Sequence, residues 1–398
     1  MNLRSLPYRA VALTGLVALL AGCAGNSAIT PSGTPGSLAG TQAFAHTDSQ
    51  AGHATSTPAG TDVLAGILAG KNFEQVHYSK TNPPGPLPEA LMSRIQPHGA
   101  GVRATAIQFD RAKIDAKKAL NYVFTSDGGT GDINIYDEAS LTLLGQGAGF
   151  GGWGVAADKK GHVCWGTFSG TIACGNTSVY GWTPTAYLSE STGDAMGLAF
   201  TSNGDLYATN FGSTIIDHWS AAQVAGCSGP CLPVSSFGVA ALGYAYYLGA
   251  DGAKLYVDGY DSSFTYAVVG AVNVKTGKFA ETIISPASEF FPGGVAFDKS
   301  HTLIWDDQYG VLLSLAKPYS SVTGYLDYNN GTNPLDYSGI ALDSKETDLL
   351  AANIYNCGSS TCSNAQENSY PLGSVGLASG TNGDVADVGI AITPPAKN

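Results

Sequence analysis

Short apolar segments that open on glycine recur along this chain at intervals of roughly 40 to 50 residues. Each carries a glycine, an aliphatic residue and an alanine, and each ends on aspartate or threonine: residues 154–158, 197–201, 294–298, 339–343 and 389–393. A repeat of this length that consists of strands alone is typical of a β-propeller. The spacing therefore predicts an all-β fold, but it leaves the function open, because propellers serve binding, scaffolding and catalysis alike.

A second strand follows most of the glycine-led segments after a short polar turn. These second strands begin at Tyr122, Val163, Leu206, Leu255, Leu303 and Leu349. Each begins a run rich in β-branched and aromatic residues, which favours a strand. With a third and a fourth strand in each repeat, the six starts predict a six-bladed propeller. The alternative of seven blades requires residues 62–118 to supply more than an arm.

The two ends of the repeat are incomplete in complementary ways. The run from Tyr122 has no glycine-led strand before it, and the segment 389–393 has no second strand after it. The simplest prediction is that the last segment pairs with the first run and closes the ring by its termini, which removes exposed sheet edges. In a rival register, residues 104–109 supply the closing strand.

The leading glycines have a physical reason. Inner strands crowd round a central channel, and a residue without Cβ lets neighbouring backbones approach closely. The copy at residues 246–250 is degenerate, because its leading glycine is missing.

Residues 1–22 have the pattern of a signal peptide, which is a targeting segment and not part of the fold. Arg4 and Arg9 precede an apolar stretch that is too short for a bilayer span of about 20 residues. The sequence Leu-Ala-Gly-Cys that ends at Cys23 resembles the lipobox of bacterial lipoproteins, whose cysteine becomes lipidated and N-terminal. We therefore expect a palmitate-bearing Cys23 in the cell envelope, and Ala24, which is not an aspartate, favours the outer membrane, facing the periplasm or the cell surface.

The remaining chain divides into three parts by composition. Residues 23–61 are mostly Gly, Ser, Thr, Ala and Pro, which predicts a flexible linker after the lipidated cysteine. Residues 62–118 are interpreted as an N-terminal arm that lies on the propeller. The propeller domain spans residues 119–398, which is long enough for one large core.

Six cysteines follow Cys23, and they form three close pairs: Cys164–Cys174, Cys227–Cys231 and Cys357–Cys362. An exported chain meets an oxidising compartment, in which such pairs become disulfides. A structural zinc site is disfavoured, because the two loop pairs fall in different blades and no histidine pair has ligand spacing.

The charge of the chain limits its partners. The formal net charge is −12 and only 13% of residues are charged. Nucleic acid and anionic lipid surfaces both favour basic patches, so neither is an expected partner. The membrane contact is expected to be the lipid anchor.

In propellers the second strands end on the face where ligands usually bind. The strand ends carry Asp127, Asn210, Asp258, Asp307 and Asn353, and the loops that lead into inner strands carry Trp153, Phe291 and Tyr337. Oxygen ligands at a channel mouth suit Ca²⁺, and carboxylates beside aromatic rings suit a sugar. The alternative is that Asn and Asp end these strands because they close turns. The histidines His162, His218 and His301 are read as structural, and no catalytic residue is assigned.

The glycine-led strand and the second strand Leu-Tyr-Ala-Thr-Asn, residues 206–210, resemble the NHL and SMP-30/gluconolactonase-like propellers and, more loosely, the streptogramin-lyase-like ones. The resemblance covers about residues 119–393. Lactonases of that family hold a divalent cation with a glutamate from an inner strand and with Asn or Asp from later blades. The resemblance would make Asn210 and Asp307 such ligands, but no inner strand of this chain opens with a glutamate.

Three functions follow from these observations. The favoured one is a lipid-anchored, non-catalytic propeller that binds an envelope protein or a small polar ligand. The second is a metal-dependent lactonase or hydrolase of the SMP-30-like class. The third is a structural protein of the cell wall.

Overall fold

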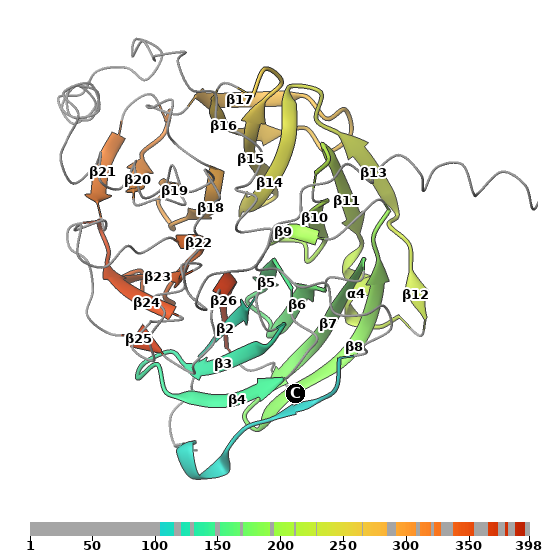
Figure 1. Ribbon diagram of the computed structural model, residues 1–398, viewed down its shortest axis with the longest axis vertical. Helices are drawn as coiled ribbons and strands as arrows, with labels where there is room; N and C mark the ends of the chain where they lie inside the picture. Colours follow the sequence, from blue (N-terminus) through green and yellow to red (C-terminus); the bar gives the residue numbers. More distant parts are fainter. Residues whose placement is uncertain are drawn as a thin grey trace, which may run out of the picture. The chain divides into compact units, whose positions relative to one another are not determined.

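The computed structural model describes residues 104–114, 121–127, 131–147, 152–167, 170–191, 195–210, 212–227, 229–264, 266–284, 292–307, 311–319, 322–327, 337–353, 365–372, 379–380 and 387–394. Contacts divide the chain into two compact units, Met1–Gly40 and Thr41–Asn398, and every described residue belongs to the second. Its strands form small, mainly antiparallel sheets in a propeller-like arrangement (Figure 1). The all-β prediction is therefore confirmed.

Five of the sheets have four strands each, and each sheet is named below by its inner strand. They are β26-β2-β3-β4 (Asp387–Thr393, Tyr122–Asp127, Ile133–Asp137, Leu143–Gly147), β9-β10-β11-β13 (Ala195–Phe200, Leu206–Asn210, Ile215–Trp219, Ser235–Gly238), β14-β15-β16-β17 (Leu242–Asp251, Lys254–Asp261, Ala267–Val272, Phe279–Ile284), β18-β19-β20-β21 (Pro292–Phe297, Leu303–Asp307, Val311–Leu315, Val322–Asp327) and β22-β23-β24-β25 (Tyr337–Leu342, Asp348–Asn353, Ala365–Ser369, Ser379–Gly380).

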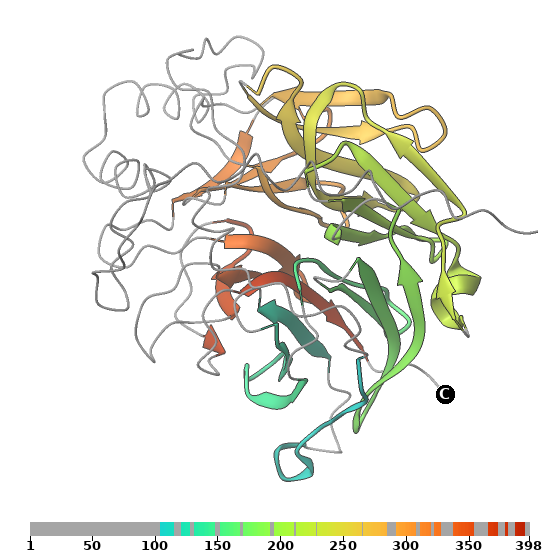
Figure 2. The same cartoon turned by 45° about the vertical axis from the view of Figure 1, so that its right-hand side comes forward.

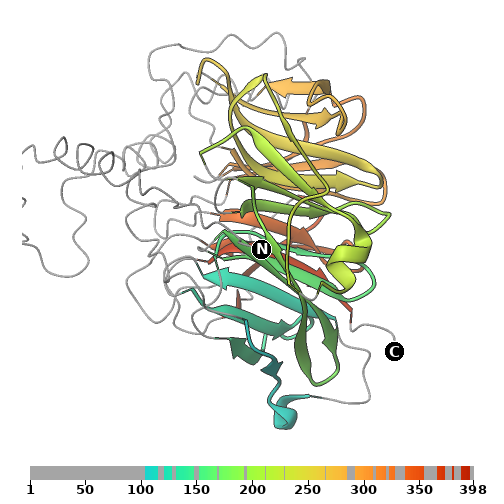
Figure 3. The same ribbon diagram turned by 90° about the vertical axis from the view of Figure 1, so that its right-hand side faces the viewer.

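A further sheet has six strands. Its inner part is β5-β6-β7-β8 (Val155–Ala157, His162–Gly166, Thr171–Ser178, Gly181–Ser189), and β8 also pairs with β1 (Ile107–Gln108) and β12 (Pro230–Cys231). Strands β5, β9, β14, β18, β22 and β26 lie round the centre in Figure 1. From the side, most strands run from one face of the arrangement toward the other (Figure 3).

The C-terminal strand β26 completes the first sheet. It pairs antiparallel with β2, so that Ile390 faces Thr125 and Ile392 faces Val123. On its two sides, β26 contacts the inner strands β22 and β5. The chain therefore joins its last strand to its first complete repeat, as the orphan segments of the sequence predicted.

Glycine is required where neighbouring inner strands touch. A Cβ on Gly197 of β9 would lie 2.5 Å from the Tyr246 carbonyl oxygen and 2.6 Å from the Tyr247 Cα, both in β14. A Cβ on Gly389 of β26 would lie 2.5 Å from the Trp153 carbonyl oxygen, just before β5. These backbones can approach so closely only because no side chain stands between them.

In the degenerate copy at residues 246–250, the close contact with the neighbouring inner strand occurs two positions later than in the other copies. Tyr247 lies where the leading glycine is expected, and Gly249 comes next to β18, with its Cβ position 2.7 Å from Val295 Cγ1. The missing glycine of this copy is thus replaced by a glycine at the alanine position.

The core consists of apolar clusters that fill the spaces between adjacent sheets. At each such junction a small residue of one inner strand meets a larger aliphatic residue of the next. The pairs are Ala156 with Leu198, Ala199 with Leu248, Ala296 with Ile340, Ala341 with Ile390, and Ala391 with Val155. Interdigitation of small and large side chains at native packing density explains the repeated aliphatic-alanine pattern.

Residues 104–114 form a strap along the rim, between the outer strands β8 and β4 (Figures 1 and 2). Ile107 pairs with Trp182 of β8, and the Asp110 N–H donates to the Leu144 carbonyl oxygen of β4 at 2.7 Å. Phe109 is buried edge-on against Tyr122, 4.9 Å between ring centres. The rival register, in which residues 104–109 close the ring, is therefore wrong, because this segment pairs at the outer edge of the β5 sheet.

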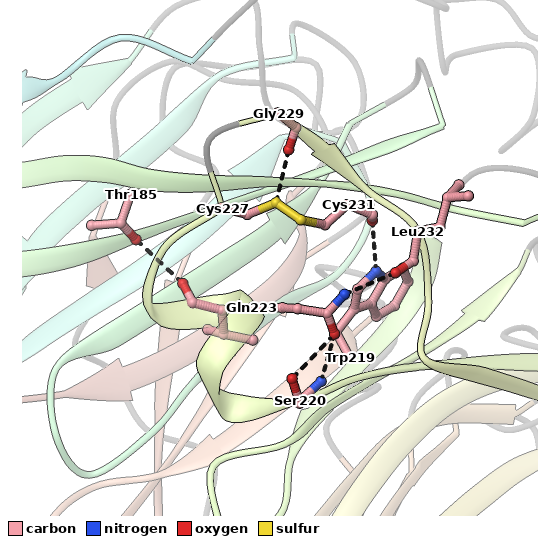
Figure 4. The surroundings of a disulfide bond; sticks show 9 residues. Thr185, Trp219, Ser220, Gln223, Cys227, Gly229, Cys231 and Leu232 are labelled. Atoms are coloured by element: carbon pink, nitrogen blue, oxygen red, sulfur yellow. Dashed lines mark hydrogen bonds between the residues drawn. A yellow bond between two sulfur atoms is a disulfide. The ribbon is translucent and has the colours of Figure 1, made fainter.

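The predicted disulfide Cys164–Cys174 is confirmed: it joins two residues that face each other across β6 and β7. The structure also joins Cys227 to Cys231, beside the short helix α4 (Ala221–Ala225) (Figure 4). The Trp219 indole N–H donates to the Cys231 carbonyl oxygen at 3.0 Å. Cys23 and the pair Cys357–Cys362 lie outside the described residues.

Candidate functional site

The predicted site residues at the second-strand ends occupy matching positions in several sheets. Asp127, Asn210, Asp307 and Asn353 each end a second strand. Tyr337 pairs with Asn353, and Trp153 is buried. The backbone positions therefore share one end of their sheets. The side chains of Asp307, Asn353 and Tyr337, and all of Phe291, lie outside the described part.

Asn210 belongs to a buried polar network. Its Nδ2 donates to Asp217 Oδ2 at 3.1 Å, and both side chains are fully buried. Asp217 also accepts hydrogen bonds from Ser191 N, Ser191 Oγ and Ser236 Oγ. This carboxylate links the segment after β8 to the β9 sheet, and Asn210 contributes one of its donors. Asn210 Oδ1 has no hydrogen-bond partner among the described residues.

Asp258 lies one position before Gly259, which matches Asn210 in register, although β15 itself continues to Asp261. At this position Thr209 and Asp258 each face a bulge of their own inner strand, and the pairing of β2 with β26 shifts register immediately after Ser126. Each also reaches the next sheet: Ser126 Oγ donates to the Gly152 carbonyl oxygen, and Thr209 Oγ1 to that of Tyr246. These buried side chains tie adjacent sheets together.

Of these three side chains, Asp258 accepts hydrogen bonds at both of its side-chain oxygens. Its Oδ1 accepts from the Tyr247 N–H at 2.7 Å, and its Oδ2 accepts from the Trp305 indole N–H of the next sheet at 3.2 Å. Burial raises the pKa of Asp258 well above its usual value, while hydrogen bonds from Tyr247, Trp305 and Gly293 oppose the shift. All of these partners are donors, so the position requires an acceptor at both oxygens.

Substitution Asp258→Asn should lower the free energy of unfolding by about 1–2 kcal/mol, because one oxygen acceptor becomes a donor and one buried N–H loses its partner. Urea unfolding followed by tryptophan fluorescence measures this change. Asp110→Asn, at an exposed carboxylate that accepts from the Ala112 N–H and lies 3.8 Å from Lys113 Nζ, is the control. Equal midpoints for the two variants would contradict the role given to Asp258.

A narrow shaft runs along the inner strands. Residues of β5, β9, β14, β18, β22 and β26 line a space of about 220 Å³. The lining is almost entirely glycine, alanine and larger apolar residues, among them Leu198, Val295 and Ile390. The repeated glycine-aliphatic-alanine segments thus line the shaft, and their polar backbone atoms contribute more of its exposed surface than apolar atoms do.

A wider cavity of about 570 Å³ lies at the turns that follow the inner strands, and we call it the turn-face cavity. It shares the lining residues Ala157, Phe200, Ala250 and Phe297 with the shaft, so the two spaces adjoin each other. Charged side chains from several turns complete its wall: Asp158, Lys159, Lys160, Asp251, Asp298, Lys299, His301 and Glu346.

The carboxylates of this wall are occupied by donors. Asp158 Oδ2 lies 2.7 Å from His162 Nδ1, and Asp251 pairs with His301 and with Lys317 Nζ at 2.9 Å. Asp298 and Glu346 accept further bonds, from Tyr370 Oη and from the Lys299 N–H. By contrast, the ammonium groups of Lys159 and Lys160 make no hydrogen bond or ion pair within the described part of the chain and are exposed.

Two of these carboxyl groups have lowered pKa values. Partial burial alone would raise the pKa of Asp158, but hydrogen bonds from His162 and Lys160 outweigh it. The pKa of Asp251 is lowered in the same way, because Lys317 and His301 outweigh the effect of burial. Both groups therefore remain charged in the folded protein at pH values where a free aspartate begins to be protonated.

Acid should weaken the fold through these two groups. Because their folded-state pKa values are depressed, they stabilise the protein above the unfolded value of about 3.9, and this contribution is lost as the pH falls through the folded-state values. We expect the urea concentration at the unfolding midpoint to decrease as the pH is lowered below about 4. Asp251→Asn should lower this midpoint at pH 7, and the midpoints of variant and parent should converge at low pH. A constant difference between the two at every pH would contradict this account.

Among the described residues, no group of three or more His, Cys, Asp and Glu side chains gathers in a way that would hold a metal ion. The same part of the chain contains no helix that is both long and apolar enough to cross a membrane.

Comparisons with known proteins support the fold and no more. No protein-family profile and no curated protein matches the chain. Among solved structures, a protein of unknown function from Bacteroides caccae matches with a TM-score of 0.50 and 10% identity, over 70% of this chain and 100% of that one. At this identity the similarity shows the propeller-like architecture alone.

Sequence reasoning did not identify the turn-face cavity. In the sequence, Lys159 and Lys160 look like part of an ordinary polar turn between strands, and His301 looks like a structural histidine. A usable signal was nevertheless present: the inner strands end on Asp or Thr, and charged residues follow several of them.

Proposed function

We propose that the chain is a lipid-anchored, extracytoplasmic binding or protein-interaction module, built as a six-bladed propeller of the NHL/SMP-30-like type. The observation that carries the binding role is the turn-face cavity, which adjoins the shaft. The cavity volume of about 570 Å³ lies in the range of about 300–1,000 Å³ that is common for small-molecule sites.

The anchoring part of the proposal rests on the lipobox-like sequence that ends at Cys23. Two or three acyl chains on one cysteine hold a protein firmly, since each buried methylene contributes about 0.8 kcal/mol. The proposed location is the outer membrane, facing the periplasm or the cell surface. The proposed partners there are an envelope protein or a small ligand.

Fractionation of a bacterial host that expresses the full chain tests this function. The parent should sediment with membranes, and its N-terminal peptide should begin at Cys23 and carry acyl chains by mass spectrometry. Cys23→Ser should release the protein into the soluble fraction or leave the signal peptide attached. A parent that is soluble, or that is cleaved elsewhere without acylation, would reject the anchor.

A further inference from the structure

We propose that Ser235, His218 and Asp205 form a catalytic site that hydrolyses small carboxylic esters. All three belong to the β9 sheet: Ser235 begins β13, His218 lies in β11, and Asp205 directly precedes β10. The pairing of these strands brings the three side chains together. This activity goes beyond the proposed binding function and does not depend on it.

Ser235 and His218 are a nucleophile and a base in contact with each other. They face each other in the antiparallel register of β13 and β11, so their side chains lie on the same face of the sheet. His218 Nδ1 lies 3.0 Å from Ser235 Oγ, and Ser235 is exposed to solvent. A neutral imidazole at this distance can take the hydroxyl proton while Oγ attacks a carbonyl carbon.

The other side of the imidazole is held by Asp205 and Tyr207. His218 Nε2 is buried and lies 3.2 Å from Asp205 Oδ2, and the poor alignment of these two atoms is common before substrate binds. Asp205 is itself fixed, because it accepts from the Ala221 N–H at 2.9 Å and from Asn203 Nδ2 at 2.8 Å. The Tyr207 ring stacks on the imidazole, 4.5 Å between ring centres. The base is therefore oriented by a third group, whose charge stabilises the imidazolium that forms.

The open edge of β13 supplies a donor for the oxyanion. β13 is the outermost strand of its sheet, and its register against β11 is regular from Ser235 to Gly238. Just after it, the Val239 N–H donates to the Thr214 carbonyl oxygen of the inner side. Because N–H groups alternate in direction along an antiparallel strand, the Ser236 N–H points to the open edge. It directly follows the nucleophile and is placed to donate to the oxygen of a tetrahedral intermediate.

Exposed apolar side chains beside the nucleophile indicate the kind of ester. Val234 directly precedes Ser235, and both Val234 and Leu232 are exposed. Contact with an alkyl group would remove part of this apolar surface from water. Neither Ser235 nor His218 lines the shaft or the turn-face cavity, so the site is open on the surface. We therefore expect an ester with a short apolar acyl group.

The reaction has two balanced steps. Ser235 Oγ forms a bond to the acyl carbon while His218 Nδ1 takes the proton, and the bond from that carbon to the alcohol oxygen breaks as the alcohol leaves with the proton. A water molecule then attacks the acyl-serine, with His218 again accepting and returning a proton. The products are one alcohol and one carboxylic acid, and Ser235 is restored.

Hydrolysis of p-nitrophenyl butyrate by the full chain, followed by the release of p-nitrophenol, tests the site. Ser235→Ala and His218→Gln should each lower kcat/KM by about a hundredfold or more. Ser262→Ala, at an exposed serine in the turn after β15, is the matched control and should keep the activity of the parent.

Asp205 is a positioning residue, and its variant separates orientation from structure. Asp205→Asn should lower kcat by about tenfold or more and leave KM unchanged, because the imidazole is less well oriented and its charged form is less stabilised. A merely structural role would leave kcat per folded molecule unchanged.

A fluorophosphonate is the second probe, since it forms a phosphorus–oxygen bond with an activated serine as fluoride leaves. Peptide mapping by mass spectrometry should find the modification at Ser235, and His218→Gln should abolish it. The proposal is overturned if the parent is no faster than Ser235→Ala, if His218→Gln with native circular dichroism is as active as the parent, or if the probe leaves Ser235 unmodified. Those results would leave the lipid anchor untouched, because fractionation of the Cys23→Ser variant tests the anchor separately.

Discussion

Removal of residues 387–398 is expected to give a chain that does not reach the native fold. The deletion takes away β26, so β2 loses its antiparallel partner. It also removes Ile390 and Ala391, which pack at the junctions on both sides of this sheet. A native domain is stable by only about 5–15 kcal/mol. The free energy lost through two open junctions and one unpaired strand exceeds that stability.

Near-ultraviolet circular dichroism and size-exclusion chromatography measure this loss. A chain that stops after Pro394 keeps all of β26 and is the matched control. A synthetic peptide of residues 385–398, added in trans, should restore part of the native signal to the longer deletion. A deletion variant that folds without the peptide would show that β26 is dispensable.

Gly197→Val should destabilise the protein by about 3 kcal/mol or more, because its side chain meets backbone that cannot yield. The Cβ alone would lie 2.5 Å from the Tyr246 carbonyl oxygen and 2.8 Å from the Leu248 N, in the adjacent inner strand. Either β14 must move away from β9 or the sheet must bend, and both changes open the junction that Leu248 fills. The midpoint of urea unfolding at constant slope measures the effect.

Gly226→Ala is the control for this substitution. A Cβ on Gly226 meets nothing within 4 Å, and its φ of −179° is extended backbone that alanine adopts freely. The control should leave the midpoint near that of the parent. If Gly197→Val were equally mild, the inner strands would not be in the close contact described for them.

Much of the architecture could be predicted from the sequence because the repeat records a physical constraint. Each inner strand needs a glycine where backbones touch, an aliphatic residue for one junction and an alanine for the other. Glycine-led segments such as residues 339–343 are therefore recognisable in the sequence. The closing role of β26 followed from the same pattern. Tyr247 broke the pattern locally, and only the packing against Val295 shows how Gly249 compensates.

The candidate site was harder to predict, because bulges and turns determine where its side chains lie. The sequence points to Asp258 as a strand-end carboxylate, but a bulge in β14 directs it to the Tyr247 N–H and into a junction. Conversely, the lysines beside Asp158 look like ordinary turn residues. Their common cavity depends on the placement of several turns round one axis, which no local pattern records.

The register of β2 against β26 is the most direct test of the account, because the shaft and its cavity exist only in a ring closed by this pair. We suggest cysteines in place of Thr125 and Ile390, which face each other. Paired residues on one face lie about 4.5–5.5 Å apart between Cβ atoms, within reach of a disulfide, whereas diagonal residues lie about 7–8 Å apart.

After mild oxidation, peptide mapping by mass spectrometry should find the cross-link between positions 125 and 390 in most molecules. The control with cysteines in place of Thr125 and Ile392 should show little. Equal yields from both pairs, or no cross-link from the facing pair in protein that retains its native circular dichroism, would contradict closure of the ring by its C-terminal strand.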